Sequence, residues 1–338
     1  MQMKLNFGKR IGIDLGTANS IVYLAGEGIV LNEPTVVAVT QEDNKILAVG
    51  NEAKEMLGRT PENIVARRPL KDGVIADYIV TEALLRYFID KVAGTSRLFK
   101  PEVMVCVPSG VTPVERRAVM DATMSAGARV AYLIDEPLAA AIGAKIPIAQ
   151  PSGNMIIDIG GGSAEAAVIS LGGVVVHGSV RVGGTALDEA IITYMRRSYN
   201  LIIGERMAEE IKLVLGTAIP IEDELSMEVK GRSVMDGLPK AVEVSAMQIH
   251  EVLNPYLAQI VQMVSNVLER TPPELAADII DKGIVMSGGT STLKNFDKLM
   301  MEKTGVPVYL AEQPLLCVAL GTGLAIENID LYRRGISK

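Results

Sequence analysis

The chain has 338 residues, more than one hydrophobic core usually supports, so two lobes or domains are expected. Its 40 acidic and 33 basic residues give a formal net charge of −7, which argues against a nucleic-acid-binding protein, because such proteins normally carry a basic surface. With two histidines, two cysteines and no CxxC or HExxH motif, no transition-metal site is predicted. Cys106 and Cys317 lie in separate apolar runs and are expected to be buried and reduced.

No apolar run reaches the roughly 18 residues that suggest a membrane-spanning helix. The first residues lack the apolar region of a signal peptide. We therefore expect a soluble, cytoplasmic protein.

Strands alternate with helices along the chain. Buried or alternating apolar runs predict strands at 10–15, 20–23, 36–39 and 102–107. The capping box Thr112–Glu115, with proline at the first helical position, predicts a helix that runs to about Ser125.

Two further capping boxes are predicted. One is at Thr271–Glu274; in the other, Ser245 and Gln248 open a long helix that runs to about Glu269. Pro255 is expected to kink or interrupt this long helix, because proline lacks an N–H donor.

The two halves of the chain carry the same three segments in the same order. The first half contains GIDLGT at 12–17, VMVCVPSG at 103–110 and LIDEPLAAAIG at 133–143, and the second contains IDIGGGS at 157–163, GIVMSGG at 283–289 and LAEQPLLCVALG at 310–321. In this alignment Ser109 corresponds to Ser287. One such match occurs in any α/β protein, but three in order predict two similar α/β lobes that face each other across a ligand-binding cleft.

Each half begins with an Asp-Gly loop that directly follows a buried strand. In the first loop, Gly16 lets the backbone approach a phosphate and Thr17 adds a hydroxyl donor. In the second, Asp158 is followed by Gly160, Gly161 and Gly162. A carboxylate beside a phosphate requires a cation between them, so Asp14 and Asp158 are predicted to hold Mg²⁺ through water. Neither loop is a Walker A motif or a GxGxxG motif.

These motifs resemble those of the superfamily that contains actin, the heat-shock chaperone ATPases and the sugar kinases. Residues 13–17 and 158–163 resemble its two phosphate motifs, 133–143 and 314–323 its two connecting helices, and 284–290 its adenosine motif. Within it, IGIDLGTANS, GIVLNEPTVVAV, RPLKDGVIADY, EPLAAAIG, PSGNMIIDIGGGS and TPPELAADIIDKGI are similar, in order, to segments of the MreB family of bacterial actins. The resemblance spans about residues 10–330.

The resemblance implies an α/β, actin-like ATPase fold with two similar, ribonuclease H-like lobes around a nucleotide cleft. Residues 1–9 would form a tail and a possible weak membrane anchor. Lobe I would span 10–150 with an inserted subdomain at about 32–75, and lobe II 151–338 with an insertion at about 184–250. A C-terminal helix at about 314–334 is expected to pack back on lobe I.

By the same resemblance, Glu136 orients the water that attacks the γ-phosphate. The alternative is that Glu136 only caps its helix, where an acid is favoured by the helix dipole. Ser163 takes the place of the family's usual threonine; it retains the hydroxyl and would place the water or the γ-phosphate. The predicted nucleotide-binding residues are Gly16, Thr17, Ala18, Asn19, Gly160, Gly161, Gly162, Glu209, Lys212, Gly288, Gly289 and Thr290.

One of these assignments has an alternative interpretation, and another residue differs from the family's usual motif. Glu209 and Lys212 are spaced i,i+3 and would clamp ribose and adenine, although a solvated ion pair between them is the alternative. Thr290 replaces the third glycine of the family's usual GGG motif, which bears on nucleotide affinity and on the choice between adenine and guanine.

Leu98 and Phe99 form an apolar pair between Arg97 and Lys100, which suits insertion into an anionic membrane leaflet. The alternative is a loop that packs both side chains on its own lobe. The resemblance favours insertion of Leu98 and Phe99 into the membrane.

The resemblance implies a filament-forming ATPase that binds ATP or ADP with Mg²⁺ and couples hydrolysis to polymerisation. Its expected partners are copies of itself in head-to-tail, antiparallel-paired protofilaments, the inner face of the cytoplasmic membrane, a RodZ-like transmembrane adaptor and the cell-wall synthesis machinery, with no nucleic acid. The expected role is maintenance of rod shape. The alternatives are a filament for plasmid segregation or organelle alignment, and a non-filamentous ATPase of chaperone or sugar-kinase type.

Overall fold

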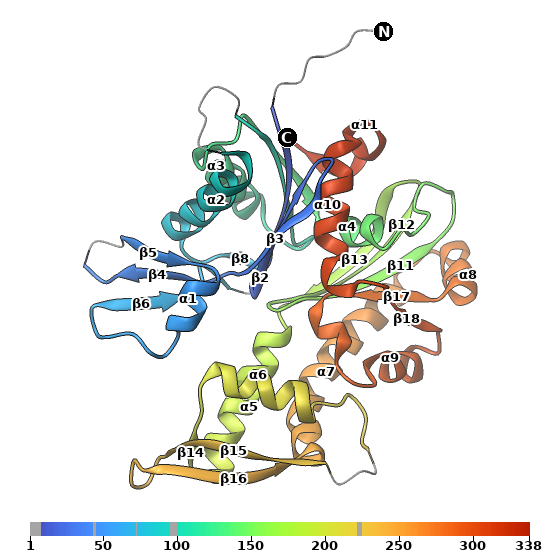
Figure 1. Cartoon of the computed structure of the whole chain (residues 1–338). Helices are drawn as coiled ribbons and strands as arrows, with labels where there is room; N and C mark the ends of the chain where they lie inside the picture. The colour runs from blue at the N-terminus through green and yellow to red at the C-terminus, as the bar shows by residue number, and fades with distance from the viewer. Residues whose placement is uncertain (1–7, 43–44, 72, 95–99, 222–224) are drawn as a thin grey trace.

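The computed structural model describes residues 8–42, 45–71, 73–94, 100–221 and 225–338 (Figure 1). Two large sheets form its centre. Their strands are, for lobe I, β1 (Arg10–Leu15), β2 (Asn19–Leu24), β3 (Gly28–Pro34), β9 (Glu102–Val107), β10 (Val130–Asp135) and β19 (Ile336–Ser337), and for lobe II, β11 (Asn154–Ile159), β12 (Ala164–Ser170), β13 (Gly173–Val180), β17 (Ile284–Ser287) and β18 (Val308–Leu310).

The two sheets share one topology. Lobe I has the order β19-β10-β9-β1-β2-β3 and lobe II the order β13-β12-β11-β17-β18. In each, three strands form an antiparallel meander, and the first of them also pairs in parallel with a later strand, β1 with β9 and β11 with β17. The duplication predicted from the sequence is therefore confirmed in strand order. The predicted strands at 10–15 and 102–107 have the observed bounds.

Each lobe carries a smaller sheet inserted into the sequence (Figure 1). The lobe I insertion contains β4 (Val37–Thr40), β5 (Ile46–Val49), α1 (Asn51–Met56) and β6 (Ile64–Arg67), followed by the pair β7 (Leu70–Lys71) and β8 (Val74–Ile75). The lobe II insertion contains α5 (Gly184–Tyr199), β14 (Leu201–Ile202), α6 (Glu205–Leu215), β15 (Ser226–Ser233) and β16 (Pro239–Ser245).

The remaining helices cover the two main sheets. They are α2 (Tyr78–Ala93), α3 (Pro113–Ser125), α4 (Glu136–Gly143), α7 (Ala246–Glu269), α8 (Pro273–Lys282), α9 (Phe296–Thr304), α10 (Cys317–Glu327) and α11 (Ile329–Tyr332), with 3₁₀ turns at Gly289–Thr292, Pro314–Leu316 and Arg333–Gly335. Among the described residues no single helix is long and apolar enough to cross a membrane; the bent pair Pro314–Glu327 and Ile329–Gly335 passes that test by length and composition alone.

Two of the three predicted capping boxes form. Thr112 with Glu115 opens α3, and Ser245 with Gln248 opens α7, which continues through Pro255 to Glu269. The predicted box at Thr271 is wrong: Pro272 occupies the N-cap position of α8, and the Thr271 hydroxyl donates to the carbonyl of Val267 at 2.7 Å. Its hydroxyl therefore closes the last turn of α7 and does not open α8.

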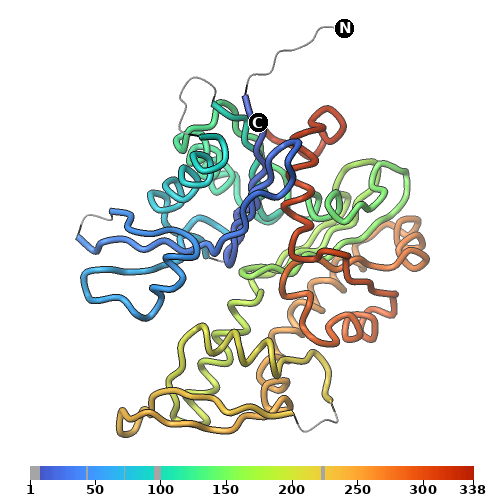
Figure 2. Tube along the Cα trace, viewed as in Figure 1, coloured from blue at the N-terminus to red at the C-terminus, as the bar shows by residue number. Residues whose placement is uncertain are grey.

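The two lobes meet where α4 and α10 cross (Figure 2). A Cβ on Gly143 would lie 1.9 Å from the Cys317 carbonyl oxygen, and one on Gly321 would lie 1.7 Å from that of Ala139. The backbones of the two helices are thus in direct contact, which only glycine allows. Cys106 and Cys317 are both free and buried, as predicted.

Candidate functional site

The two loop aspartates lie at equivalent places in the two lobes. Asp14 is on β1 and accepts a hydrogen bond from the Cys106 thiol at 3.3 Å, on the neighbouring parallel strand β9. Asp158 is on β11 and accepts one from the Ser287 hydroxyl at 2.7 Å, on the neighbouring parallel strand β17. The residue that corresponds to Ser287 is therefore Cys106, and the predicted match with Ser109 is wrong by three positions.

Carboxylates from both lobes converge between these loops. Burial raises the pKa of Asp14 to about 7, to which the charge of Asp158 also contributes. Burial likewise raises the pKa of Asp158 to about 6. The pKa of Glu136 is raised well above its usual range, first by burial and then by the charges of Glu165, Asp14 and Asp158. Such mutually repelling acids gain from a cation placed among them.

The converging side chains of Asp14, Asp158 and Glu136 offer only oxygen atoms, which Mg²⁺ prefers as ligands. No group of three or more His, Cys, Asp or Glu side chains in the described ranges is placed to hold a metal together. Mg²⁺ commonly keeps several waters and takes phosphate oxygens as ligands, so one or two carboxylates suffice. Asp14 and Asp158 fit Mg²⁺ held in that way.

The two glycine loops touch each other across the lobes. A Cβ on Gly162 would lie 2.4 Å from the Thr17 hydroxyl oxygen, and one on Gly161 would lie 2.7 Å from the Cβ of Ala18. Gly16 is equally confined, because its Cβ would lie 2.6 Å from the carbonyl oxygen of Asn19. The glycines are therefore required for the close approach of the two loops.

The loops also present unused donors. Within the described part of the chain, the amides of Ala18, Gly161 and Gly162 donate to no protein acceptor, whereas that of Gly160 donates to the Ser163 carbonyl. The Thr17 hydroxyl accepts a hydrogen bond from the amide of Gly73 at 3.0 Å, which leaves its own proton available. Adjacent free amides of this kind make an anion-binding concavity that fits phosphate.

Glu136 and its neighbour Asp135 have different surroundings. The Asp135 carboxylate pairs with Arg116 and makes no capping hydrogen bond to α4. No hydrogen bond or ion pair of the Glu136 carboxylate occurs among the described residues, so it is available to a water molecule. Its position beside Asp14 and Asp158 favours the water-orienting interpretation over simple capping, and the catalytic role stays a prediction.

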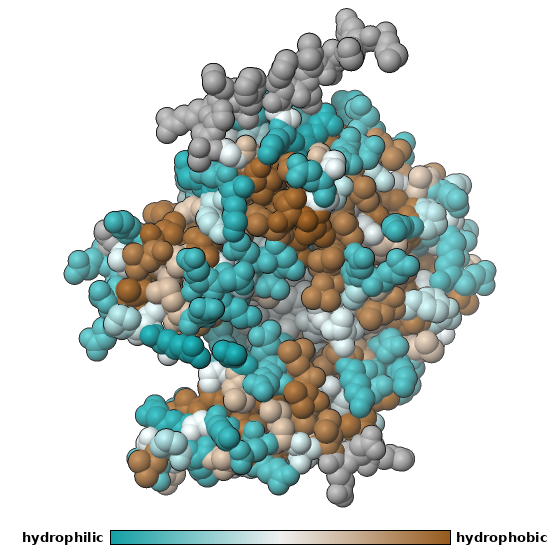
Figure 3. All heavy atoms as spheres, in the orientation of Figure 1, coloured by the Kyte–Doolittle hydropathy of each residue, from teal (hydrophilic) through white to brown (hydrophobic). Residues whose placement is uncertain are grey.

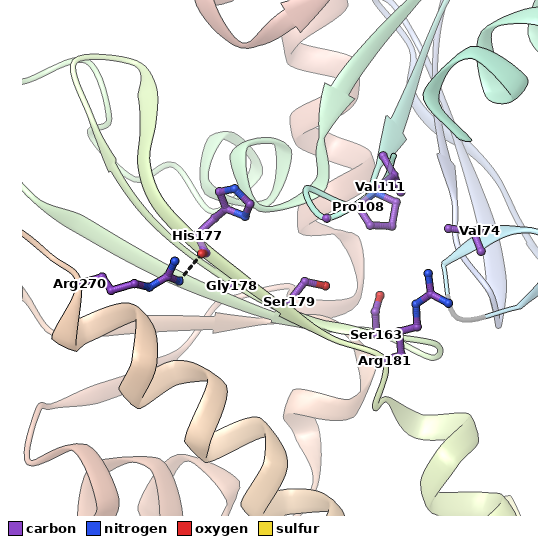
Figure 4. Close-up of a pocket in the computed structure, with 10 residues that line it drawn as sticks. Val74, Pro108, Val111, Ser163, His177, Gly178, Ser179, Arg181 and Arg270 are labelled. Atoms are coloured by element: carbon purple, nitrogen blue, oxygen red, sulfur yellow. Dashed lines mark hydrogen bonds between the residues drawn. The ribbon is translucent and has the colours of Figure 1, made fainter. Parts of the chain in front are cut away.

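Ser163 lies at the wall of a cavity between the lobes (Figure 4). The cavity measures about 390 Å³ and is also lined by Pro108 and Val111 of lobe I and by Arg181 of lobe II. The Ser163 hydroxyl makes no hydrogen bond to any described residue, although the side chain is only 7% exposed. A buried hydroxyl without a protein partner is suited to a ligand or a water.

Glu165 is a site residue that the sequence analysis missed. It lies on β12, is 1% exposed, and accepts hydrogen bonds from the amide of Ser109 at 3.0 and 3.1 Å and from its hydroxyl at 3.1 Å. Burial nevertheless raises its pKa to about 7. Glu165 thus joins lobe II to lobe I and acts electrostatically on Glu136. The available signal was an acid within the apolar strand SAEAAV.

Glu209 and Lys212, which are predicted to contact the ribose and adenine, each form an ion pair with another residue of the protein. The Lys212 ammonium lies 2.8 Å from one oxygen of Asp188 and donates to the Gly184 carbonyl at 3.1 Å. Glu209 lies 3.9 Å from Lys54 of the lobe I insertion, and both side chains are about half exposed. Glu209 and Lys212 therefore do not form the mutual ion pair considered as the alternative.

The SGGT segment packs on the second phosphate loop. The Thr290 hydroxyl donates to the Gly160 carbonyl at 2.8 Å, which fixes that loop to the 3₁₀ turn containing Gly289. Gly288 has a φ of +86°, and a Cβ there would lie 2.3 Å from the Ile159 carbonyl oxygen. Thr290, which replaces the family's usual glycine, therefore stabilises the second phosphate loop through its hydroxyl. Gly288 must remain glycine, because no side chain fits there. Leu98 and Phe99 lie outside the described residues.

Comparison with known proteins identifies the family. The family model described as "MreB/Mbl protein" matches residues 8–334. The chain belongs to the MreB/Mbl family. It is 51% identical to the cell shape-determining protein MreB of Escherichia coli (strain K12), over 96% of this chain and 95% of that protein. It is 48% identical to the cell shape-determining protein Mbl of Bacillus subtilis (strain 168), over 98% of this chain and 100% of that protein.

Solved structures agree with this MreB/Mbl assignment. MreB 5 of Spiroplasma citri bound to AMPPNP superposes with a TM-score of 0.89 at 37% identity, over 96% of this chain and 97% of that chain. The same protein bound to ADP also superposes with a TM-score of 0.89. A chain of the MamK double helical filament gives 0.78 at 19% identity over 94% of this chain and 98% of that chain, which shows a shared fold. The predicted actin-like α/β fold is confirmed.

Proposed function

We propose that this chain binds ATP with Mg²⁺ between its two lobes, hydrolyses it, and assembles into filaments on the inner face of the cytoplasmic membrane. These filaments organise cell-wall synthesis and maintain rod shape. The observation that carries the proposal is the contact between two glycine loops from opposite lobes, with Asp14 and Asp158 beside unused backbone amides. That arrangement fits the phosphates of a nucleotide and a divalent cation.

Similar proteins support the proposal. The MreB 5 structures contain AMPPNP and ADP, and the curated relatives in Escherichia coli and Bacillus subtilis are described as cell shape-determining. Copies of the chain would associate head to tail, a heterologous contact that leaves filaments open. Antiparallel pairing of protofilaments, a RodZ-like adaptor and the wall-synthesis machinery complete the proposed set of partners.

Each group at the site has a role in this proposal. Bound Mg·ATP supplies a γ-phosphoryl group whose charge is partly neutralised by the metal. The amides of Ala18, Gly161 and Gly162 hold the phosphate oxygens, with the Thr17 hydroxyl beside them. Glu136 orients the attacking water, and the Ser163 hydroxyl fixes its position. Because phosphoryl transfer gains mainly from placement and electrostatics, these positions matter more than strong acid or base chemistry.

Sedimentation tests the filament. We expect the protein to pellet when MgATP is added and to stay in the supernatant without nucleotide, since the nucleotide would hold the two lobes in the polymerising arrangement. An Asp14→Asn variant, which keeps the side-chain shape but loses the charge, serves as the control and should pellet poorly. A chain that remains monomeric with MgATP at high concentration would instead be a non-filamentous ATPase of chaperone or sugar-kinase type.

Liposome binding tests the membrane role. Changing Leu98 and Phe99 together to serine should reduce co-sedimentation with anionic liposomes by about tenfold or more, because each buried apolar side chain contributes on the order of 1.5–3 kcal/mol. Met235→Ser is a matched control, because that side chain is 80% exposed on the lobe II insertion.

Two results would count against the membrane role. Unchanged liposome binding of the double variant would show that this apolar pair is not the anchor. Absence of liposome binding by the unaltered filament would favour a plasmid-segregating or organelle-aligning filament.

A further inference from the structure

Arg68 joins three parts of the molecule that the sequence keeps apart. It directly follows β6, at the base of the lobe I insertion. Its guanidinium donates to the carbonyl of Ala18, in the first phosphate loop, at 3.3 Å. It also lies 3.7 Å from the carboxylate of Glu205, the first residue of α6 in the lobe II insertion. An arginine can make both contacts at once because its planar group carries five N–H donors.

The charge of Arg68 also reaches α5. Burial raises the pKa of Asp188, and the nearby positive charges of Lys212 and Arg68 act in the opposite direction. Asp188 is the partner of Lys212, which the sequence predicts to contact the nucleotide. Arg68 is therefore within electrostatic reach of the ion pair that fixes Lys212.

A second ion pair joins the same two insertions. Lys54 on α1 lies 3.9 Å from Glu209, which is one helical turn after Glu205 on α6. The i,i+4 spacing places Glu205 and Glu209 on one face of α6, toward the lobe I insertion. Figure 3 shows the molecular surface hollowed between the two insertions, with hydrophilic side chains at the margin. Both of these ion pairs thus join a lobe I cation to a lobe II carboxylate.

We propose that Arg68 is a positioning residue that holds the two insertions together over a bound nucleotide, with the Lys54–Glu209 pair as a second, weaker contact. Arg68 couples the first phosphate loop to the helix that carries Glu209 and Lys212. A nucleotide leaves this site when the insertions separate, and their separation breaks both ion pairs. The inference rests on the proposed nucleotide-binding function and assigns Arg68 to retention of the nucleotide, a role separate from the chemical step.

The test is the rate at which a fluorescent ADP analogue, preloaded with Mg²⁺, is displaced by excess ATP. Arg68→Gln should release the analogue on the order of tenfold faster, because a charged hydrogen bond and a partly exposed ion pair are both lost. Arg68→Glu should release it faster still. The double variant Arg68→Glu, Glu205→Arg should release the analogue more slowly than Arg68→Glu alone, because opposite charges again face each other, while the hydrogen bond to the Ala18 carbonyl stays lost.

Two controls separate this role from a structural one. Arg59→Gln removes the same charge from an exposed position of the same insertion and should leave the release rate within twofold. Added salt should speed release from the unaltered protein more than from Arg68→Gln, because screening weakens a pair that the variant lacks. A merely structural arginine would alter thermal unfolding without changing this salt dependence.

Several outcomes would overturn the inference. Release rates within twofold of the unaltered protein for both Arg68 variants would do so, as would a charge-exchanged variant that releases the analogue as fast as Arg68→Glu alone. If the Arg68 variants do not fold, Glu205→Gln at its exposed position carries the test, and unchanged release there would also overturn it. Failure of the unaltered protein to bind the analogue at all would instead refute the proposed nucleotide-binding function.

Discussion

Replacing Glu136 with glutamine should slow ATP hydrolysis about a hundredfold or more while nucleotide binding stays within a fewfold of normal. The carboxylate lies among Asp14, Asp158 and Glu165 and has no protein partner in the described ranges, so its replacement removes a group that orients water without breaking a protein contact. Single-turnover release of phosphate, measured beside the affinity for a fluorescent ATP analogue, separates the two effects.

The neighbouring acid provides a matched control. Asp135→Asn removes the same charge one residue earlier, but Asp135 pairs with Arg116 on α3. That variant should lose some stability and keep most of its hydrolysis rate. Equal hydrolysis by Glu136→Gln and the unaltered protein would refute the water-orienting role, whereas an equal loss in both variants would point to a general effect of charge.

Gly321→Ala should destabilise the protein by about 3 kcal/mol or more, one of the largest effects expected from a single methyl group. The added Cβ would lie 1.7 Å from the carbonyl oxygen of Ala139, so the backbones of α4 and α10 would have to separate. Because these helices join the lobes, we also expect the variant to bind nucleotide more weakly. Urea unfolding followed by circular dichroism measures the first effect.

Gly173→Ala is the appropriate comparison for that experiment. A Cβ there would meet its nearest atom, the Ser170 carbonyl oxygen, at 3.9 Å, which is an ordinary contact. Its free energy of unfolding should change by about 0.5 kcal/mol or less. If Gly321→Ala were as stable as Gly173→Ala, the close crossing of α4 and α10 would not be a structural requirement.

Structural features that depend only on residues close together in the sequence were mostly predicted correctly. The bounds of β1 and β9, and the capping boxes at Thr112 and Ser245, follow from short apolar runs and from hydrogen bonds across three residues. The box at Thr271 failed because α8 begins one residue later, with Pro272 at its N-cap position, while the Thr271 hydroxyl donates to the carbonyl of Val267 in the preceding helix. Sequence pattern alone does not decide which of the two adjoining helices such a hydroxyl bonds to.

Contacts between strands were harder to predict because register decides them. The sequence repeat correctly indicated two lobes with one topology, yet it matched Ser109 with Ser287. In the structure, the parallel pairing of β9 with β1 places Cys106 beside Asp14, and Ser109 instead bonds to Glu165 of the other lobe. A shift of a few residues along a strand changes the partner of every side chain, and the repeat pattern does not resolve such a shift.

The sequence by itself determined the two phosphate loops, the acid before Pro137 and the family to which the chain belongs, because each is a short run of residues with a local chemical reason. The tertiary structure alone decided which charges meet across the lobes. Glu165 of lobe II meets Ser109 of lobe I, 56 residues away in the chain, and Arg68 of lobe I meets Glu205 of lobe II, in contacts that exist only once the lobes are packed. Thus the nucleotide loops could be predicted from local pattern, whereas the residues that join the lobes around them could not.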